Sequence, residues 1–162
     1  MTDSELISLE VNGVACDAKA ALYDTLLTVL RDQLGFTGAK RGCNQGVCGA
    51  CTLLSDGIPV RACLSLALDC QGRRIETVEG LCDDPRMQAL QRAFIAQGAF
   101  QCAFCTPGML ISAYALLCGD RPVSESETRK MLSGNLCRCT GYKKIIEAVM
   151  AAARDLPTGG VG

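Results

Sequence analysis

The distribution of cysteines limits what this chain can fold into more than any other feature of its sequence. Of the 12 cysteines in 162 residues, eight fall in two groups and four are scattered. A short secreted chain of this composition is typically stapled by disulfides. The N-terminal "MTDSELISLEVNG" argues against secretion, since it lacks the basic region, long apolar run and cleavage site of a signal peptide. We therefore expect a cytoplasmic protein whose grouped cysteines bind metal or carry redox chemistry.

Charge and histidine content remove several classes of function. Sixteen basic and seventeen acidic residues give a formal charge of −1 without a long run of either sign, so nucleic acid is not an expected partner. Apolar stretches such as "GMLISAYALLCG" are too short to span a membrane. The chain has no histidine, which excludes Cys2His2 zinc sites, Rieske ligation and histidine-based acid–base catalysis. Any metal is bound mainly by sulfur.

The first half of the chain predicts strands and one helix. Apolar residues alternate over residues 5–18 around the dipeptide "NG", which predicts a hairpin with a type I′ turn. The leucines of "DTLLTVLRDQLG" recur at helical spacing, and predict a helix that starts at Asp24 or Thr25 and ends at Gly35. This segment is expected to pack on the hairpin.

Further strands are expected before residue 80. Two short apolar runs flank the Asp56-Gly57 turn, and another strand is expected through Ile75 and Val78. Strands combined with one helix indicate a small α+β unit.

Beyond residue 85 the apolar residues recur every three or four positions, which predicts four helices. Ser124 and Glu127 match a capping box, and Pro107 suits a first helical position. The chain is therefore expected to contain an α+β domain at 1–80, a connector, an all-α domain at 85–155 and a tail at 156–162.

The first cysteine group has the spacing of a plant-type 2Fe-2S site. Cys43, Cys48 and Cys51 form a C-x4-C-x2-C motif, and Cys63 follows after eleven residues. Interleaved glycines allow the backbone to curl around an inorganic core with its N–H groups directed at sulfur. A zinc site is the alternative, but zinc motifs usually pair two short Cys-Cys hairpins.

The second group is less specific by spacing alone. Cys102 and Cys105 form one pair, Cys137 and Cys139 form another, and thirty-one residues separate the two. Four thiolates could hold zinc or an iron-sulfur cluster. Both pairs lie at predicted helix junctions, where unpaired N–H groups favour an anionic cluster.

The remaining cysteines are expected to be small buried apolar residues, since an isolated cysteine usually is. They are Cys16, Cys70, Cys82 and Cys118. Gln101 by itself is an ordinary polar residue at a helix end.

The motifs "GCNQGVCGACTLLSDGIPVRAC", "QCAFCTPGM" and "GNLCRCTGY", in this order, resemble the small iron-sulfur subunit of the xanthine oxidase family of molybdenum hydroxylases. The resemblance runs from about residue 5 to 155. It implies a ferredoxin-like β-grasp domain, followed by a four-helix domain, each carrying one 2Fe-2S cluster. The ligands would be Cys43, Cys48, Cys51 and Cys63 for the first cluster, and Cys102, Cys105, Cys137 and Cys139 for the second.

The resemblance also implies partners. A large subunit would hold the molybdenum-pterin cofactor and the substrate site, a medium subunit would bind FAD, and the assembly would be a dimer of heterotrimers. Gln101 and Cys139 would lie against the pterin, and the first cluster would face the flavin. The chain itself would then contain no catalytic residue and would relay single electrons as the non-catalytic subunit of an oxidoreductase.

Two alternatives remain open from the sequence. One is a free-standing two-cluster ferredoxin, which would need a polar surface around both clusters. The other is a zinc-stabilised interaction module without a redox role. A zinc protein would be colourless, whereas a two-cluster protein absorbs visible light.

Overall fold

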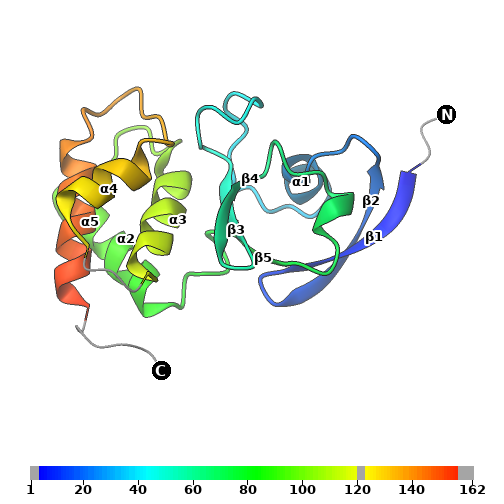
Figure 1. The fold of residues 1–162 in the computed structure, drawn as a ribbon, viewed down its shortest axis with the longest axis horizontal. Coiled ribbons are helices and arrows are strands. Elements are labelled where there is room, and N and C mark those ends of the chain that lie inside the picture. Colours follow the sequence, from blue (N-terminus) through cyan, green and yellow to red (C-terminus); the bar gives the residue numbers. More distant parts are fainter. Residues whose placement is uncertain (1–3, 120–122, 157–162) are drawn as a thin grey trace.

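A computed structural model describes residues 4–119 and 123–156 and shows a five-stranded sheet beside four helices (Figure 1). The sheet order is β2-β1-β5-β3-β4, with β1 and β5 parallel and the other pairs antiparallel. This is the expected α+β class. The strands are β1 (Ser4–Val11), β2 (Val14–Ala21), β3 (Thr52–Ser55), β4 (Ile58–Arg61) and β5 (Arg74–Glu76).

The Asn12-Gly13 turn has the predicted conformation, and the turn at Asp56-Gly57 shares it. Asn12 and Gly13 connect β1 to β2 with φ angles of 53° and 77°, and Asp56 and Gly57 connect β3 to β4 with 51° and 77°. Positive φ at both central residues defines a type I′ turn, which matches the twist of the flanking strands.

The helix predicted over 24–35 is present but shorter and partly irregular. It comprises α1 (Leu26–Thr28) and a π-helical turn at Val29–Gln33. Thr25 is the cap, because its hydroxyl accepts a hydrogen bond from the N–H of Thr28 at 3.2 Å. A further 3-10 turn spans Leu68–Cys70.

The strand expected through Ile75 and Val78 ends earlier, at Glu76. The N–H of Thr77 donates to the side-chain oxygen of Asn12 at 2.9 Å instead of to a neighbouring strand. A side-chain bond thus ends the strand and ties it to the first hairpin.

The four helices of the second half are confirmed. They are α2 (Pro85–Gln97), α3 (Thr106–Leu117), α4 (Glu125–Leu132) and α5 (Lys143–Asp155). Ser124 and Glu127 form the predicted capping box, whereas Pro107 is the second helical residue rather than the first. None of the helices in the described ranges is long and apolar enough to cross a membrane. Of the expected tail, residues 157–162 lie outside those ranges.

Two apolar cores lie on opposite faces of β3. Leu53 belongs to the core formed between the sheet and α1. Leu54 belongs to the core formed by α2, α3, α4 and α5. Alternate side chains of a strand point to opposite faces, so β3 contributes to both cores. In Figure 1, α3 lies alongside β3, and its Met109 and Ile111 are fully buried.

We expect Leu54→Ala to lower the free energy of unfolding by about 2–5 kcal/mol, because it opens a cavity between β3 and the helices. Ile58→Ala is the control, since this β4 side chain is 65% exposed and its removal should change stability by less than about 0.5 kcal/mol. Urea unfolding of the cluster-loaded chain measures both. Equal losses would mean that β3 does not join the two cores.

Candidate metal centres

The loop that carries Cys43, Cys48 and Cys51 contains several residues with left-handed backbone conformation (positive φ). Asn44, Gly46 and Gly49 have φ angles of 55°, 76° and 71°. Gly42 is needed for a different reason, because a Cβ at this position would lie 2.8 Å from the Cys48 sulfur. The loop therefore closes tightly around its own thiols.

Backbone N–H groups of this loop point at sulfur. The N–H groups of Gln45 and Cys48 both donate to the Cys43 sulfur at 3.3 Å, and that of Gly46 donates to the Cys63 sulfur at 3.3 Å. The bonds from Cys48 and Gln45 lower the pKa of the Cys43 thiol to about 6. The loop thus stabilises negative charge on sulfur, as an anionic cluster requires.

Two thiols of the first group face inward. Cys51 and Cys63 are buried, and burial, with smaller effects from neighbouring thiols, raises the pKa of Cys51 to about 11. A bound metal deprotonates such a thiol outright, so the high pKa does not prevent ligation.

The second group combines two loops that precede helices. Cys105 is the cap residue of α3, and Cys137 and Cys139 lie in the loop before α5. The sulfurs of Cys102 and Cys139 are 3.5 Å apart. Burial is the main cause, and the neighbouring Cys137 the second, of a pKa of Cys105 that is raised to about 12. Cys102 and Cys139, which are 37 positions apart in sequence, are thereby brought to one place.

Thr140 is a sulfur-bonding residue that the sequence patterns did not identify. Its backbone N–H and its hydroxyl donate to the Cys137 sulfur at 3.3 Å and 3.0 Å. Burial raises the pKa of Cys137, but the two bonds from Thr140, together with smaller ones from Cys139 and Cys105, outweigh it and bring the pKa below its ordinary value. Its position next to Cys139 in "CRCTGY" is the only signal in the sequence that could have indicated this role.

One side of the second group lies at the protein surface. Cys102 and Cys139 are exposed, and the side-chain amide of Gln101 donates to the Cys139 carbonyl at 3.0 Å. Large apolar side chains are exposed on the residues that flank these thiols: Phe100, Phe104 and Leu136.

The eight thiols form two sulfur-only groups with N–H and hydroxyl donors directed at them, which fits 2Fe-2S clusters. A single zinc ion needs four ligand atoms about 2.0–2.3 Å from one point. Within residues 4–119 and 123–156, no set of three or more Cys, Asp or Glu side chains is arranged to hold one ion.

The four scattered cysteines are not all buried as expected. Cys70 is buried and Cys16 is half-buried, whereas Cys82 and Cys118 are exposed. The expectation is wrong for the last two because they lie outside the strands and helices, in the connector before α2 and just after α3.

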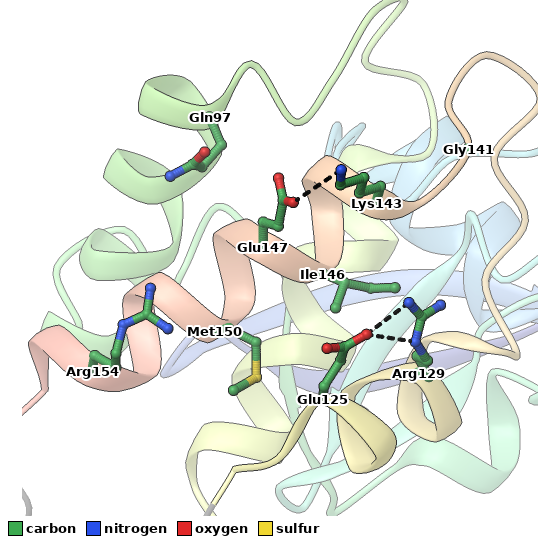
Figure 2. A pocket seen from close by; sticks show the side chains of 9 residues that line it. All are labelled: Gln97, Glu125, Arg129, Gly141, Lys143, Ile146, Glu147, Met150 and Arg154. Carbon is green, nitrogen blue, oxygen red and sulfur yellow. Dashed lines mark hydrogen bonds and ion pairs between the residues drawn. The ribbon is translucent and has the colours of Figure 1, made fainter.

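A groove of about 590 Å³ lies between α2, α4 and α5, and Figure 2 shows its side chains. Ion pairs between Glu125 and Arg129 and between Lys143 and Glu147 engage most of its charged groups. None of its nine lining residues is a cysteine, so the groove is separate from both thiol groups.

Comparison with known proteins identifies the family. Residues 77–150 match the 2Fe-2S binding domain family. The chain is 46% identical to caffeine dehydrogenase subunit gamma of Pseudomonas sp. (strain CBB1), over 93% of this chain and 92% of that protein. It is 41% identical to the xanthine dehydrogenase iron-sulfur-binding subunit of Escherichia coli O157:H7, over 93% and 96%. The chain belongs to the small iron-sulfur subunits of the xanthine oxidase family of molybdenum hydroxylases.

A solved structure agrees with this assignment. A chain of quinoline 2-oxidoreductase from Pseudomonas putida 86 superimposes with a TM-score of 0.87 at 46% identity, covering 93% of this iron-sulfur subunit and 94% of that chain. The expected family, fold class and 2Fe-2S cofactors are confirmed. Iron-sulfur subunits of this family transfer electrons in complexes whose large and FAD-binding subunits carry the catalytic activity. A free ferredoxin and a zinc module are not favoured.

We expect this iron-sulfur subunit to contain about four iron and four acid-labile sulfide per chain, because each of its two clusters holds two of each. Metal analysis and sulfide assay of the purified chain measure the ratio. One zinc with two iron would contradict the assignment of the second group.

Proposed function

We propose that residues 1–80 form a ferredoxin-like domain and residues 85–155 a helical domain, each holding one 2Fe-2S cluster. The separate apolar cores on the two faces of β3 support this division. The proposed ligands are Cys43, Cys48, Cys51 and Cys63 in the first domain, and Cys102, Cys105, Cys137 and Cys139 in the second.

The proposed role is to relay single electrons between the molybdenum-pterin site of the large subunit and the FAD of the medium subunit. A bound 2Fe-2S cluster supplies one-electron chemistry while its ligands stay in place. The protein's own part is to stabilise the added negative charge, through the N–H groups at Cys43 and Cys63 and the hydroxyl of Thr140 at Cys137.

The exposure of Cys102 and Cys139 among exposed apolar side chains carries the assignment of the molybdenum side. An apolar surface next to a cluster is unsuited to a freely diffusing ferredoxin and suited to a covering partner. Gln101 and Cys139 would contact the pterin there. The first cluster would then face the FAD-binding subunit.

The complete assembly is proposed to be a cytoplasmic dimer of heterotrimers. Each heterotrimer would contain this chain, the large subunit and the medium subunit. The proposal rests on the family to which the chain belongs.

We expect Cys43→Ser and Cys102→Ser each to remove one cluster signal and leave the other, because the ligands belong to separate domains. Electron paramagnetic resonance of the reduced chain, together with iron content, measures this. Loss of both signals from a folded variant would contradict the two-domain proposal. The control changes, which should retain both signals, are Cys16→Ala, Cys70→Ala, Cys82→Ala and Cys118→Ala.

We expect Gln101→Ala to slow reduction of the clusters by substrate roughly 10- to 100-fold in the assembled complex, as loss of an outer-shell partner does at other metal sites. Stability should change by less than about 0.5 kcal/mol because Gln101 is exposed. Stopped-flow reduction, with molybdenum and iron contents, tests this. Gln97→Ala is the control, since Gln97 is an exposed glutamine at the end of α2. Unchanged rate and contents would contradict the pterin contact.

A further inference from the structure

A buried polar side chain lies between the two cysteine loops. Asn135 is 2% exposed. Its side-chain amide donates to the Gly49 carbonyl at 3.0 Å and lies 3.3 Å from the Thr52 hydroxyl, while its oxygen accepts from the Ser112 hydroxyl at 2.8 Å. A buried amide is costly unless it is paired, and Asn135 is paired on both of its ends.

These bonds join the segments that carry the proposed ligands of different clusters. Gly49 lies between Cys48 and Cys51, and Asn135 is two residues before Cys137. The next residue, Leu136, donates its N–H to the Cys48 carbonyl at 2.8 Å. The two loops are therefore fixed to each other at the positions of their thiols.

The backbones approach too closely to admit a side chain at this contact. A Cβ at Gly49 would collide with the Gly134 carbonyl, and a Cβ at Gly108, in the first turn of α3, would collide with the Gly49 carbonyl. Three segments thus meet backbone to backbone around Asn135.

Arg61 forms a second connection across the same contact. Its guanidinium donates to the Thr52 hydroxyl at 2.6 Å and to the Gly134 carbonyl at 2.5 Å. Arg61 ends β4 two residues before Cys63, so a third proposed ligand segment is included. The planar fork of arginine can bridge two acceptors, which the single ammonium of lysine does less well.

We propose that Asn135, assisted by Arg61, is a positioning residue that fixes the separation and relative orientation of the two clusters. This inference rests on the ligand sets proposed above. Both the rate of electron transfer between two centres and the magnetic coupling between them fall steeply with separation. A loosened contact should therefore change both, while each cluster stays bound by its four thiolates.

The test removes the hydrogen bonds of the Asn135 side chain one at a time, first at its nitrogen and then at its oxygen. Asn135→Asp keeps the shape and the acceptor for Ser112 but directs a carboxylate oxygen at the Gly49 carbonyl. Ser112→Ala is the matched control, because it removes a buried hydrogen bond from the other end and leaves the bond to Gly49 in place. Both changes cost a buried bond, but only the first acts on the loop of the other cluster.

The measurements are iron and sulfide content, magnetic splitting between the two reduced clusters, and the rate of electron transfer between them after rapid mixing. For Asn135→Asp we expect full iron content and both individual signals, a reduced splitting, and a rate lowered roughly 10-fold, the lower end of the effect of outer-shell changes. Ser112→Ala should keep the splitting and rate of the unmodified chain.

Arg61→Lys provides a second test if Asn135→Asp does not fold, because Arg61 is half-buried and lysine keeps its charge. It should also reduce the splitting. Unchanged splitting and rate in a loaded Asn135→Asp or Arg61→Lys variant would overturn the inference, and so would equal changes in Ser112→Ala. Failure of the ligand assignment is distinguishable, since Cys43→Ser or Cys102→Ser would then leave both cluster signals in place.

Discussion

The hydrogen bond from the Asn135 side chain to the Gly49 carbonyl joins the two halves of this protein at the point where their thiols lie. Each half has its own core, and neighbouring residues of β3, Leu53 and Leu54, belong to different cores. Burial of β3 side chains in both cores brings α3 onto the sheet. Apolar packing is non-directional, however, so by itself it would let α3 shift along β3. Hydrogen bonds of a buried amide with two fixed partners are directional, which supports the proposed role of Asn135 in setting the register between the halves.

Two kinds of hydrogen-bond donor stabilise negative charge on the sulfurs of the two cysteine loops. Around Cys43 the donors are backbone N–H groups, made available by residues with positive φ. At Cys137 a threonine hydroxyl contributes as well, at 3.0 Å. Both kinds favour the thiolate over the thiol, and both favour an anionic cluster for the same electrostatic reason. The two thiol groups therefore lie in different hydrogen-bonding environments, and hydrogen bonds to sulfur are one of the ways in which proteins set reduction potentials.

The two thiol groups also differ in exposure. Two thiols in each group are half-buried, but the other two are buried in the first group (Cys51 and Cys63) and exposed in the second (Cys102 and Cys139). A chain that transfers electrons between partners needs a path that starts and ends at surfaces which those partners cover. The exposed apolar side chains around the second group are consistent with its working as a subunit rather than as a free carrier.

The sequence by itself determined the features that depend on local spacing. Both type I′ turns, four helices, the Ser124 cap and the eight grouped thiols could be predicted, because turn geometry, helical period and ligand spacing are set by neighbouring residues. Tertiary structure alone decided the early end of β5, where Thr77 bonds Asn12 across 65 positions, and the exposure of Cys82 and Cys118. It also decided the contact at Asn135, whose partners lie up to 86 positions away. No local pattern encodes such a pairing, because it exists only when the fold brings segments distant in sequence together.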